Sequence, residues 1–352
     1  MAQLTSLTVS RRSQEIMTPT PVYDSYWNFA AERHAVYERR LAQPQGPWTD
    51  DPILAAYRFT NTYRAADRVS QYLIREVQYR PGRSQAPAEL FFRTLLFKIF
   101  NKIETWELIE AQLGPVSWQS IDLDAVSALL DRAMANGARI YSAAYIMPSP
   151  QLGHARKHAN HLALLARMMD DGLSARVERA RSLAEVYELL SPYPGLGPFL
   201  AFQYAIDLNY SNLLDLSEAD FVVAGPGALD GIAKCFEHAD GRSAREVIEY
   251  MVDVQDDEFA ARGINFKGLF GRKLQPIDCQ NIFCEISKYA RVAHPEVPGV
   301  SGRTRIKQLY RPSARVEPAP FFPPRWKLQI PMRSPEFRGG RQPVQGQLFP
   351  AA

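Results

Sequence analysis

The sequence predicts an all-α fold, a single helical domain followed by a basic tail. Two observations support this prediction. Few prolines interrupt the apolar segments between Pro52 and Pro192, so long helices can form there. Strand-like alternation is confined to two weak candidates, Asp220 to Ala224 and Leu328 to Ile330.

Apolar residues at intervals of three and four predict helices in four successive segments, residues 53–79, 88–113, 123–136 and 155–190. Gly137 and Gly153 fall where helices are expected to stop or start. No repeat of 20 to 50 residues recurs, which excludes a solenoid. We therefore expect an N-terminal extension over residues 1–51, one helical domain over 52–296, and a proline-rich tail over 297–352.

The composition describes a globular chain, because 46% of the 352 residues are hydrophobic and 22% are charged. The first fourteen residues lack an apolar signal segment, and no apolar run approaches the roughly 18 residues of a membrane span. We expect a cytoplasmic protein that is neither exported nor embedded in a membrane. Its 3 cysteines include no CxxC pair, so we expect reduced thiols and no zinc site.

The formal charge of +3 is unevenly distributed. From Ser301 onward, ten Arg and Lys residues face two Glu residues, so the tail carries +8 and the rest of the chain −5. Nine of the 26 prolines and several aromatic residues also lie in this tail. Such a composition predicts an extended arm that binds a polyanion, with nucleic acid as the usual partner, or else a solvated terminus.

The first predicted helix, residues 53–79, carries a polar and cationic stripe along one face. Placed on a helical wheel, one face carries Tyr57, Asn61, Arg64, Arg68, Gln71 and Arg75. Guanidinium groups suit phosphate oxygens, because their planar fork donates two parallel hydrogen bonds. The alternative is the ordinary solvated face of an amphipathic helix.

Residues 182–208 predict a helix, a tight turn and a second helix, and so resemble a helix-hairpin-helix element. Gly195 and Gly197 in the turn would let backbone N–H groups converge on a DNA phosphate. Gly225 and Gly227 form a second cluster, which we also expect at the DNA backbone. Their spacing does not fit a dinucleotide-binding fingerprint, and no GxxxxGK[ST] motif of a P-loop kinase is present. Asp220 fits either a catalytic aspartate or a helix cap.

Three histidines, His154, His158 and His161, share one helix face. A metal site would need a further ligand or an open position, and no nearby residue supplies either, so we expect no metal and no cofactor. Lys157 and His158 are instead expected to face a phosphate or the solvent.

The most informative stretch is LQPIDCQNIFCEISKYAR at residues 274–291. Its polar residues at intervals of three, four and three predict one helix face that carries Asp278, Asn281, Glu285 and Lys288. Such a row combines a general base, a positioning amide and an anion-stabilising amine. The alternative is an exposed Glu and Lys pair worth a few tenths of a kcal/mol.

Six separated motifs occur in order: residues 57–73, 97–106, 157–162, 194–211, 224–232 and 278–291. Together they resemble the helical domain associated with 5-hydroxymethyluracil DNA kinases, related to the putrescinyl- and glutamyl-thymine pyrophosphorylases. The resemblance covers about 240 residues. It implies a fold like that of helix-hairpin-helix DNA glycosylases. It also implies a role in DNA base hypermodification, largely in bacteriophages, where it serves restriction evasion.

In these pathways a kinase phosphorylates 5-hydroxymethyluracil in DNA, and an amino-acid:DNA transferase then displaces the phosphate with an amine. Since the P-loop motif is absent, the resemblance implies the transferase step, with an amine such as glycine. Arg64, Arg68 and Lys288 would stabilise the leaving phosphate, and Glu285 or Asp278 would deprotonate the amine. Asn61 and Asn281 would position the base or the amine.

The expected partners are double-stranded DNA with modified thymine or uracil, an amino acid or polyamine, and a 5-hydroxymethyluracil DNA kinase. Two other functions stay open. A non-catalytic reader would bind modified DNA without turnover, and a glycosylase-like enzyme would use Asp220 or Asp278 with a lysine to excise a base.

Overall fold

The computed structural model describes residues 17–43, 45–239, 241–311 and 318–330. The first fourteen residues and the tail cations Arg315, Arg333, Arg338 and Arg341 lie outside the described residues. The described chain is mostly helical, which confirms the all-α prediction. Its strands form a two-stranded antiparallel sheet of β1 (Thr18–Pro19) and β2 (Phe236–His238), and neither weak candidate is a strand.

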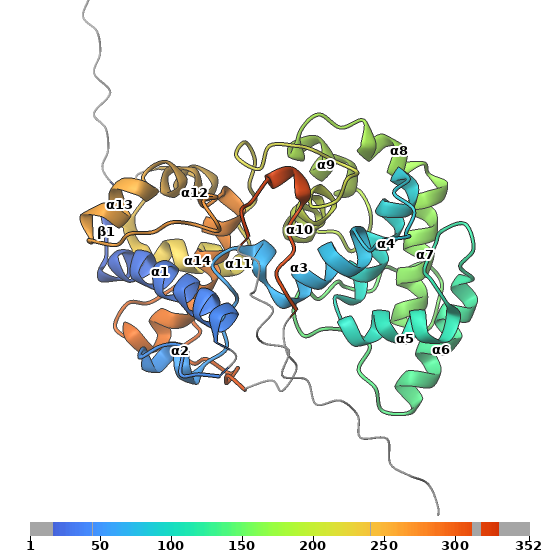
Figure 1. The fold of residues 1–352 in the computed structure, drawn as a ribbon, viewed down its shortest axis with the longest axis horizontal. Helices are drawn as coiled ribbons and strands as arrows, with labels where there is room; N and C mark the ends of the chain where they lie inside the picture. The colour runs from blue at the N-terminus through green and yellow to red at the C-terminus, as the bar shows by residue number, and fades with distance from the viewer. Residues whose placement is uncertain (1–16, 44, 240, 312–317, 331–352) are drawn as a thin grey trace, which may run out of the picture.

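The helices form two lobes (Figure 1). The first lobe joins the two ends of the domain: α1 (Pro21–Ala42), α2 (Pro52–Ala56), α11 (Pro226–Cys235), α12 (Ala244–Asp253), α13 (Gln255–Ala261) and α14 (Pro276–Ala293). Helix α14 contacts α1, α2, α11 and α12, so it is the central helix of this lobe. The predicted N-terminal extension therefore needs correction, because Tyr26 and Trp27 of α1 are fully buried in the core.

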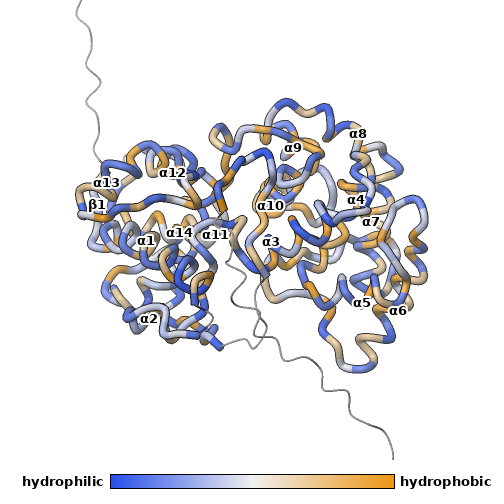
Figure 2. Tube along the Cα trace, in the orientation of Figure 1, coloured by the Kyte–Doolittle hydropathy of each residue, from blue (hydrophilic) through white to orange (hydrophobic). Residues whose placement is uncertain are grey.

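The second lobe is built from the middle of the chain: η1 (Arg64–Ala66), α3 (Arg68–Tyr72), η2 (Leu73–Gln78), α4 (Pro87–Phe100), α5 (Ile103–Leu113), α6 (Leu123–Ala135), α7 (Lys157–Asp170), α8 (Leu173–Glu178), α9 (Leu183–Leu190) and α10 (Pro198–Asn209). Helices α4 and α10 pack against each other in its centre. Apolar and polar stretches alternate along the helices of both lobes, as amphipathic helices require (Figure 2).

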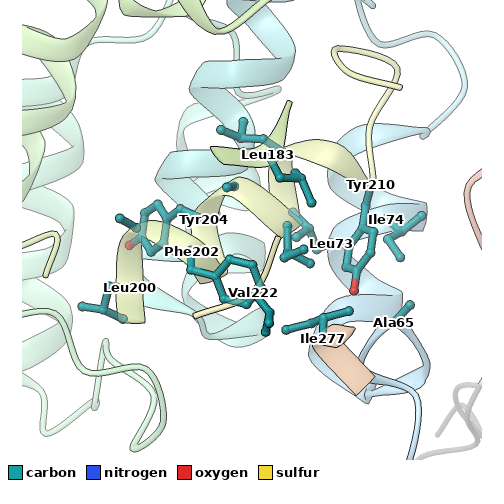
Figure 3. Packing of buried hydrophobic residues seen from close by; sticks show 14 of the residues in the cluster. Ala65, Leu73, Ile74, Leu183, Leu200, Phe202, Tyr204, Tyr210, Val222 and Ile277 are labelled. Carbon is teal, nitrogen blue, oxygen red and sulfur yellow. The ribbon is translucent and has the colours of Figure 1, made fainter. Parts of the chain in front are cut away.

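An apolar layer joins the lobes. Ile277 from α14 lies beside Val222 and Tyr210, which belong to the chain around α10 (Figure 3). All three side chains are at least 98% buried. The lobes thus share one continuous core, which fixes the polar residues that lie next to this layer.

Three of the predicted long helices are interrupted. Residues 88–113 break at Asn101, which adopts the left-handed conformation with φ 48°. Residues 155–190 break at Gly172, with φ 65°, and again before Ser182, which caps α9. Residues 53–79 break after Ala56 and re-form as η1, α3 and the π-helical η2. Residues 123–136 match α6 closely.

Two described stretches of the tail pack on the domain. Leu309 forms an antiparallel bridge with Tyr57. Residues 318–330 cross the junction of the lobes and contain η3 (Pro324–Trp326) (Figure 1). Phe322, just before η3, is 96% buried. Apart from η3, these parts of the tail are extended as expected, but they lie against the protein.

A candidate active site between the lobes

The polar row predicted on residues 274–291 lies on α14, a single helix, and faces the segment 58–64. Every residue of the row bonds to this segment: Asp278 accepts the Arg64 N–H at 3.0 Å, Asn281 donates to the Asn61 carbonyl at 2.8 Å and accepts the Thr60 hydroxyl at 3.3 Å, Glu285 accepts the Thr60 N–H at 3.1 Å, and Lys288 donates to the Arg58 carbonyl at 3.0 Å. These contacts explain why residues 57–63 are not helical, because their backbone groups bond to α14 instead.

The row becomes more exposed toward the C-terminal end of α14. Asp278 is 96% buried, whereas the Lys288 side chain is 18% exposed. Burial raises the pKa of Asp278 to about 7, although the N–H groups of Gln275 and Arg64 oppose the shift. Glu285 and Lys288 form an ion pair at 2.7 Å. The row therefore offers an acid and an amine together at its accessible end.

A deeply buried ion cluster lies next to the row. Both oxygens of Asp207 accept from the Arg64 guanidinium, at 2.7 and 2.9 Å, and Lys98 Nζ lies 2.9 Å from the same carboxylate. Arg64 Nε donates to Gln203 at 2.8 Å. The three charged side chains are 4% exposed or less. Arg64 is therefore bound inside the protein. It does not lie on the polar stripe that the helical wheel predicted.

The cluster holds two cations and one anion. Burial alone would raise the pKa of Asp207, but the attraction of Arg64 and Lys98 outweighs it and lowers the value. Burial also lowers the pKa of Lys98 to about 8, with Asp207 opposing and Arg64 reinforcing the change. An excess positive charge is thus held in place, and it can stabilise an anion that forms nearby.

Asp67 connects the cluster to the row. Its carboxylate accepts the Asn61 N–H at 2.7 Å and interacts electrostatically with Arg64 and Glu285. Desolvation raises the pKa of Asp67 to about 7, although the Asn61 N–H and the charge of Arg33 oppose the shift. A carboxyl group that titrates near neutral pH is suited to accept a proton in a reaction.

A pair of aromatic rings lies beside the ion cluster. Tyr145 and Phe199 are stacked, with ring centroids 6.0 Å apart and an interplanar angle of 6°. Both are half-buried, and Lys98 Nζ lies 3.9 Å from the centroid of Tyr145. Tyr145 has φ 55°, a strained conformation for a residue other than glycine. Asp67 also interacts electrostatically with Tyr145.

We call this assembly the interlobe site: Asn61, Arg64, Asp67, Lys98, Tyr145, Phe199, Asp207, Asp278, Asn281, Glu285 and Lys288. Five of its residues are not among the sequence predictions: Asp67, Lys98, Tyr145, Phe199 and Asp207. A signal did exist for one of them, because Asp207 is the single charge in the otherwise apolar helix α10, and such a charge needs a partner. The strained turn at Tyr145 has no comparable signal in the sequence.

Other predicted residues lie elsewhere. Arg68 is exposed at the start of α3, apart from the buried Arg64. His158 is 99% buried on α7, with Nε2 3.5 Å from Asp131, and Lys157 Nζ stacks 4.7 Å from the Tyr141 ring. In the described residues no group of three His, Cys, Asp or Glu side chains could hold a metal ion.

The predicted glycines have different surroundings. Gly195 and Gly197 lie in the turn between α9 and α10; Gly197 is exposed, and a Cβ there would meet nothing within 4 Å. A Cβ at Gly225 would lie 2.5 Å from Phe199, and one at Gly227 would lie 2.9 Å from Cys284 Sγ. Close packing therefore explains why positions 225 and 227 are glycine. The exposed Gly197, in contrast, leaves the N-terminus of α10 open.

No helix within the described ranges has the length and apolar character needed to cross a bilayer.

A family model described as the helical domain of 5-hmdU DNA kinase matches residues 20–299. Among curated proteins, a 5-hmdU DNA kinase of Bacillus phage SP10 is 26% identical over 297 residues, which cover 79% of this chain and 46% of that relative. The chain thus spans about half the length of the curated relative it matches. No solved structure gives a match. The matched residues include α1, all six motifs and every residue of the interlobe site.

Proposed function

Because the chain belongs to the family of the 5-hmdU DNA kinase helical domain, we propose that it acts in the hypermodification of thymine bases in DNA. Its substrate in this proposal is double-stranded DNA that carries 5-phosphomethyl-deoxyuridine, and its co-substrate is an amino acid or a polyamine. The sequence has no P-loop motif, so we assign to these helices the step that follows phosphorylation.

The proposed reaction is a displacement at the methylene carbon attached to C5 of the base. The amine nitrogen forms a bond to this carbon while the bond from carbon to the phosphate oxygen breaks. The phosphate leaves with the electron pair, and the enzyme accepts the proton that the incoming ammonium must lose. The reaction therefore needs a base near neutral pH and cations next to the leaving phosphate.

The interlobe site supplies both requirements, and this is the observation on which the proposal depends. Asp67 is our leading proton acceptor, with Glu285 and Asp278 as the neighbouring acids. Lys288, which is paired with Glu285, would exchange this partner for the phosphate, and the exposed Arg68 at the start of α3 would contact the phosphate from outside the site. Arg64 is engaged by Asp207 and would act through its charge. Asn61 and Asn281, joined by a hydrogen bond, would position the base or the amine.

The target base must leave the duplex to reach these residues. The half-buried rings of Tyr145 and Phe199 lie beside Lys98 and could stack on an extruded pyrimidine. The open N-terminus of α10 at Gly197, with the turn at Gly195, would contact a DNA phosphate. Lys157 and His158 have no place in this arrangement, because they lie on α7 and His158 is enclosed.

A direct assay tests the proposal. The protein is mixed with duplex DNA that contains phosphorylated 5-hydroxymethyluracil and with glycine, other amino acids or putrescine, and the digested nucleosides are analysed by mass spectrometry. We expect an amine adduct with at least one donor. The rate should rise as pH passes 7, where Asp67 ionises, and Asp67→Asn should form no adduct on either side of pH 7. If no donor gives an adduct, the transferase proposal is wrong.

A non-catalytic reader of modified DNA is the second candidate function. One observation favours it, because each polar side chain of the α14 row already bonds to the segment 58–64. A reader would bind the modified duplex equally well after Glu285→Gln and would release no product. Free base and abasic DNA in the same digest would instead indicate glycosylase activity.

A further inference from the structure

The tail residues 301–311 lie beyond the family match and are held on the first lobe by backbone hydrogen bonds. Arg58 N–H donates to the Gln308 carbonyl at 3.0 Å, and Tyr310 N–H donates to the Ala56 carbonyl at 2.9 Å. Arg291 also donates to the Arg305 carbonyl at 3.2 Å. This stretch therefore has a fixed position and register on the edge formed by residues 56–58.

The register turns the cations outward. Ile306 is partly buried and packs against the core, whereas Arg305 and Lys307 on either side of it are exposed. Arg303, two residues earlier, is exposed as well. Alternation of this kind places the three cations in a row on the outer side of the segment.

These charges are not neutralised. None of Arg58, Arg303, Arg305 and Lys307 forms an ion pair with any acidic residue in the described part of the chain, and Arg58 is exposed like the other three. Arg325, further along the tail, differs because it lies 3.1 Å from Asp215 and donates to the Ser211 carbonyl. Exposed cations without acidic partners keep their full charge for a ligand.

We propose that Arg58, Arg303, Arg305 and Lys307, which we call the basic rail, bind the phosphodiester backbone of DNA. The rail adjoins the interlobe site, because Lys288 donates to the Arg58 carbonyl and Glu285 accepts the N–H of Thr60, two residues further on. A DNA strand on the rail is thereby held next to the accessible end of the α14 row. The inference rests on the proposed function only in taking DNA as the ligand.

Salt-dependent binding to an unmodified duplex of about 20 base pairs tests the rail. Each lost phosphate contact should lower the slope of log affinity against log salt by about 0.9, so Arg303→Gln, Arg305→Gln and Lys307→Gln together should lower it by about 2.7. Between about 50 and 200 mM salt, the wild type should then lose about 40-fold more affinity than this variant.

The matched control replaces Arg176, Arg179 and Arg181, three exposed arginines on the second lobe, with Gln. It changes the net charge equally but should leave the slope unchanged. Equal slopes for the rail variant and the wild type would overturn the proposal, and so would an equal fall in the rail and control variants. Thermal melting of each variant verifies that it is folded.

A second variant tests whether the rail must be fixed. Tyr310→Pro removes the N–H that bonds to the Ala56 carbonyl and leaves every charge in place. We expect at least a fivefold loss of duplex affinity at low salt, whereas unchanged affinity would contradict a fixed rail. Because the duplex carries no modified base, the rail can be confirmed when the transferase assay fails, and the reverse also holds.

Discussion

Asp207 shows how a single residue organises the centre of this protein. Its carboxylate is 1% exposed and binds two cations from different parts of the chain, Arg64 after the loop 57–63 and Lys98 on α4. Two hydrogen bonds from one guanidinium fix both position and orientation. The same three residues give the interlobe site its excess positive charge.

Asp207→Asn should therefore destabilise the protein strongly. The change leaves two buried cations without their counter-ion, and we expect a loss of about 3–5 kcal/mol in the free energy of unfolding. Chemical denaturation measures it. The control is Glu249→Gln, which breaks the exposed pair with Arg245 and should cost less than about 1 kcal/mol. Similar losses in the two variants would contradict a buried cluster that depends on Asp207.

His161 gives a pH-dependent prediction. It is fully buried, with Nδ1 2.8 Å from the Tyr141 hydroxyl and Nε2 2.9 Å from the Pro148 carbonyl, and burial lowers its pKa to about 4. The folded state therefore favours the neutral ring. The contribution of the neutral ring to the free energy of unfolding is complete above the unfolded pKa near 6.5. About 3 kcal/mol of it is lost as pH falls toward 4.

The measurement compares unfolding of the wild type and His161→Gln between pH 7 and pH 4. The variant should lose less stability over this interval than the wild type. His154→Gln is the control, since His154 is exposed and should leave the pH dependence unchanged. A constant difference between wild type and His161→Gln at every pH would contradict the prediction.

At the scale of elements, the sequence predicts helices better than their ends. Residues 123–136 and 274–291 form single helices because their apolar periodicity and caps agree. The break at Asn101 depends on a left-handed residue, and periodicity continues across it. Residues 57–63 have helical periodicity but bond to α14, which lies more than 200 positions away. Tertiary hydrogen bonds override local preference here.

The same distinction applies to the site. The α14 row could be predicted because four residues share one face of one helix. Asp67, Lys98 and Asp207 could not be combined, because α3, α4 and α10 are brought together only by the fold. The polar stripe through Arg64 does not form, because the single helix predicted over residues 53–79 is interrupted.

The close packing of α11 on α14 gives a prediction at this scale. A Cβ at Gly231 would lie 2.0 Å from the Phe283 carbonyl oxygen, so Gly231→Ala must separate the two helices. We expect a loss of about 1–3 kcal/mol or more in chemical denaturation. Gly197→Ala is the control, because a Cβ there meets nothing within 4 Å. Equal stability of the two variants would contradict this packing.

At the scale of the whole molecule, the described parts of the positively charged tail pack on the two lobes. Its residues 301–311 follow the edge at 56–58, and its residues 318–330 contact both lobes near the interlobe site. Gln71 holds the Phe321 backbone by two hydrogen bonds, and Arg272 lies over the Trp326 ring. The positive charge predicted for a free arm is thereby placed, over these stretches, on the surface of the domain.

Phe322 should control the docking of this part of the tail. Its ring is 96% buried and lies against Phe270 and Trp326. Phe322→Ala should release residues 318–330 and raise the rate of trypsin cleavage after Lys327 at least about tenfold, since proteolysis follows local opening. Leu309→Ala, at a 60% exposed position, should leave that rate unchanged. Unchanged cleavage in Phe322→Ala would mean that Phe322 does not anchor the tail.

We propose that the interlobe site exchanges the phosphate of a modified base in DNA for an amine. The most direct measurement counts both products in one reaction, free phosphate and aminated nucleoside, over a single turnover. We expect equal amounts of the two products, no phosphate release without the amine, and loss of both products in Asp67→Asn and Glu285→Gln with duplex binding retained. Phosphate release that does not depend on the amine, or amination that survives both substitutions, would contradict it.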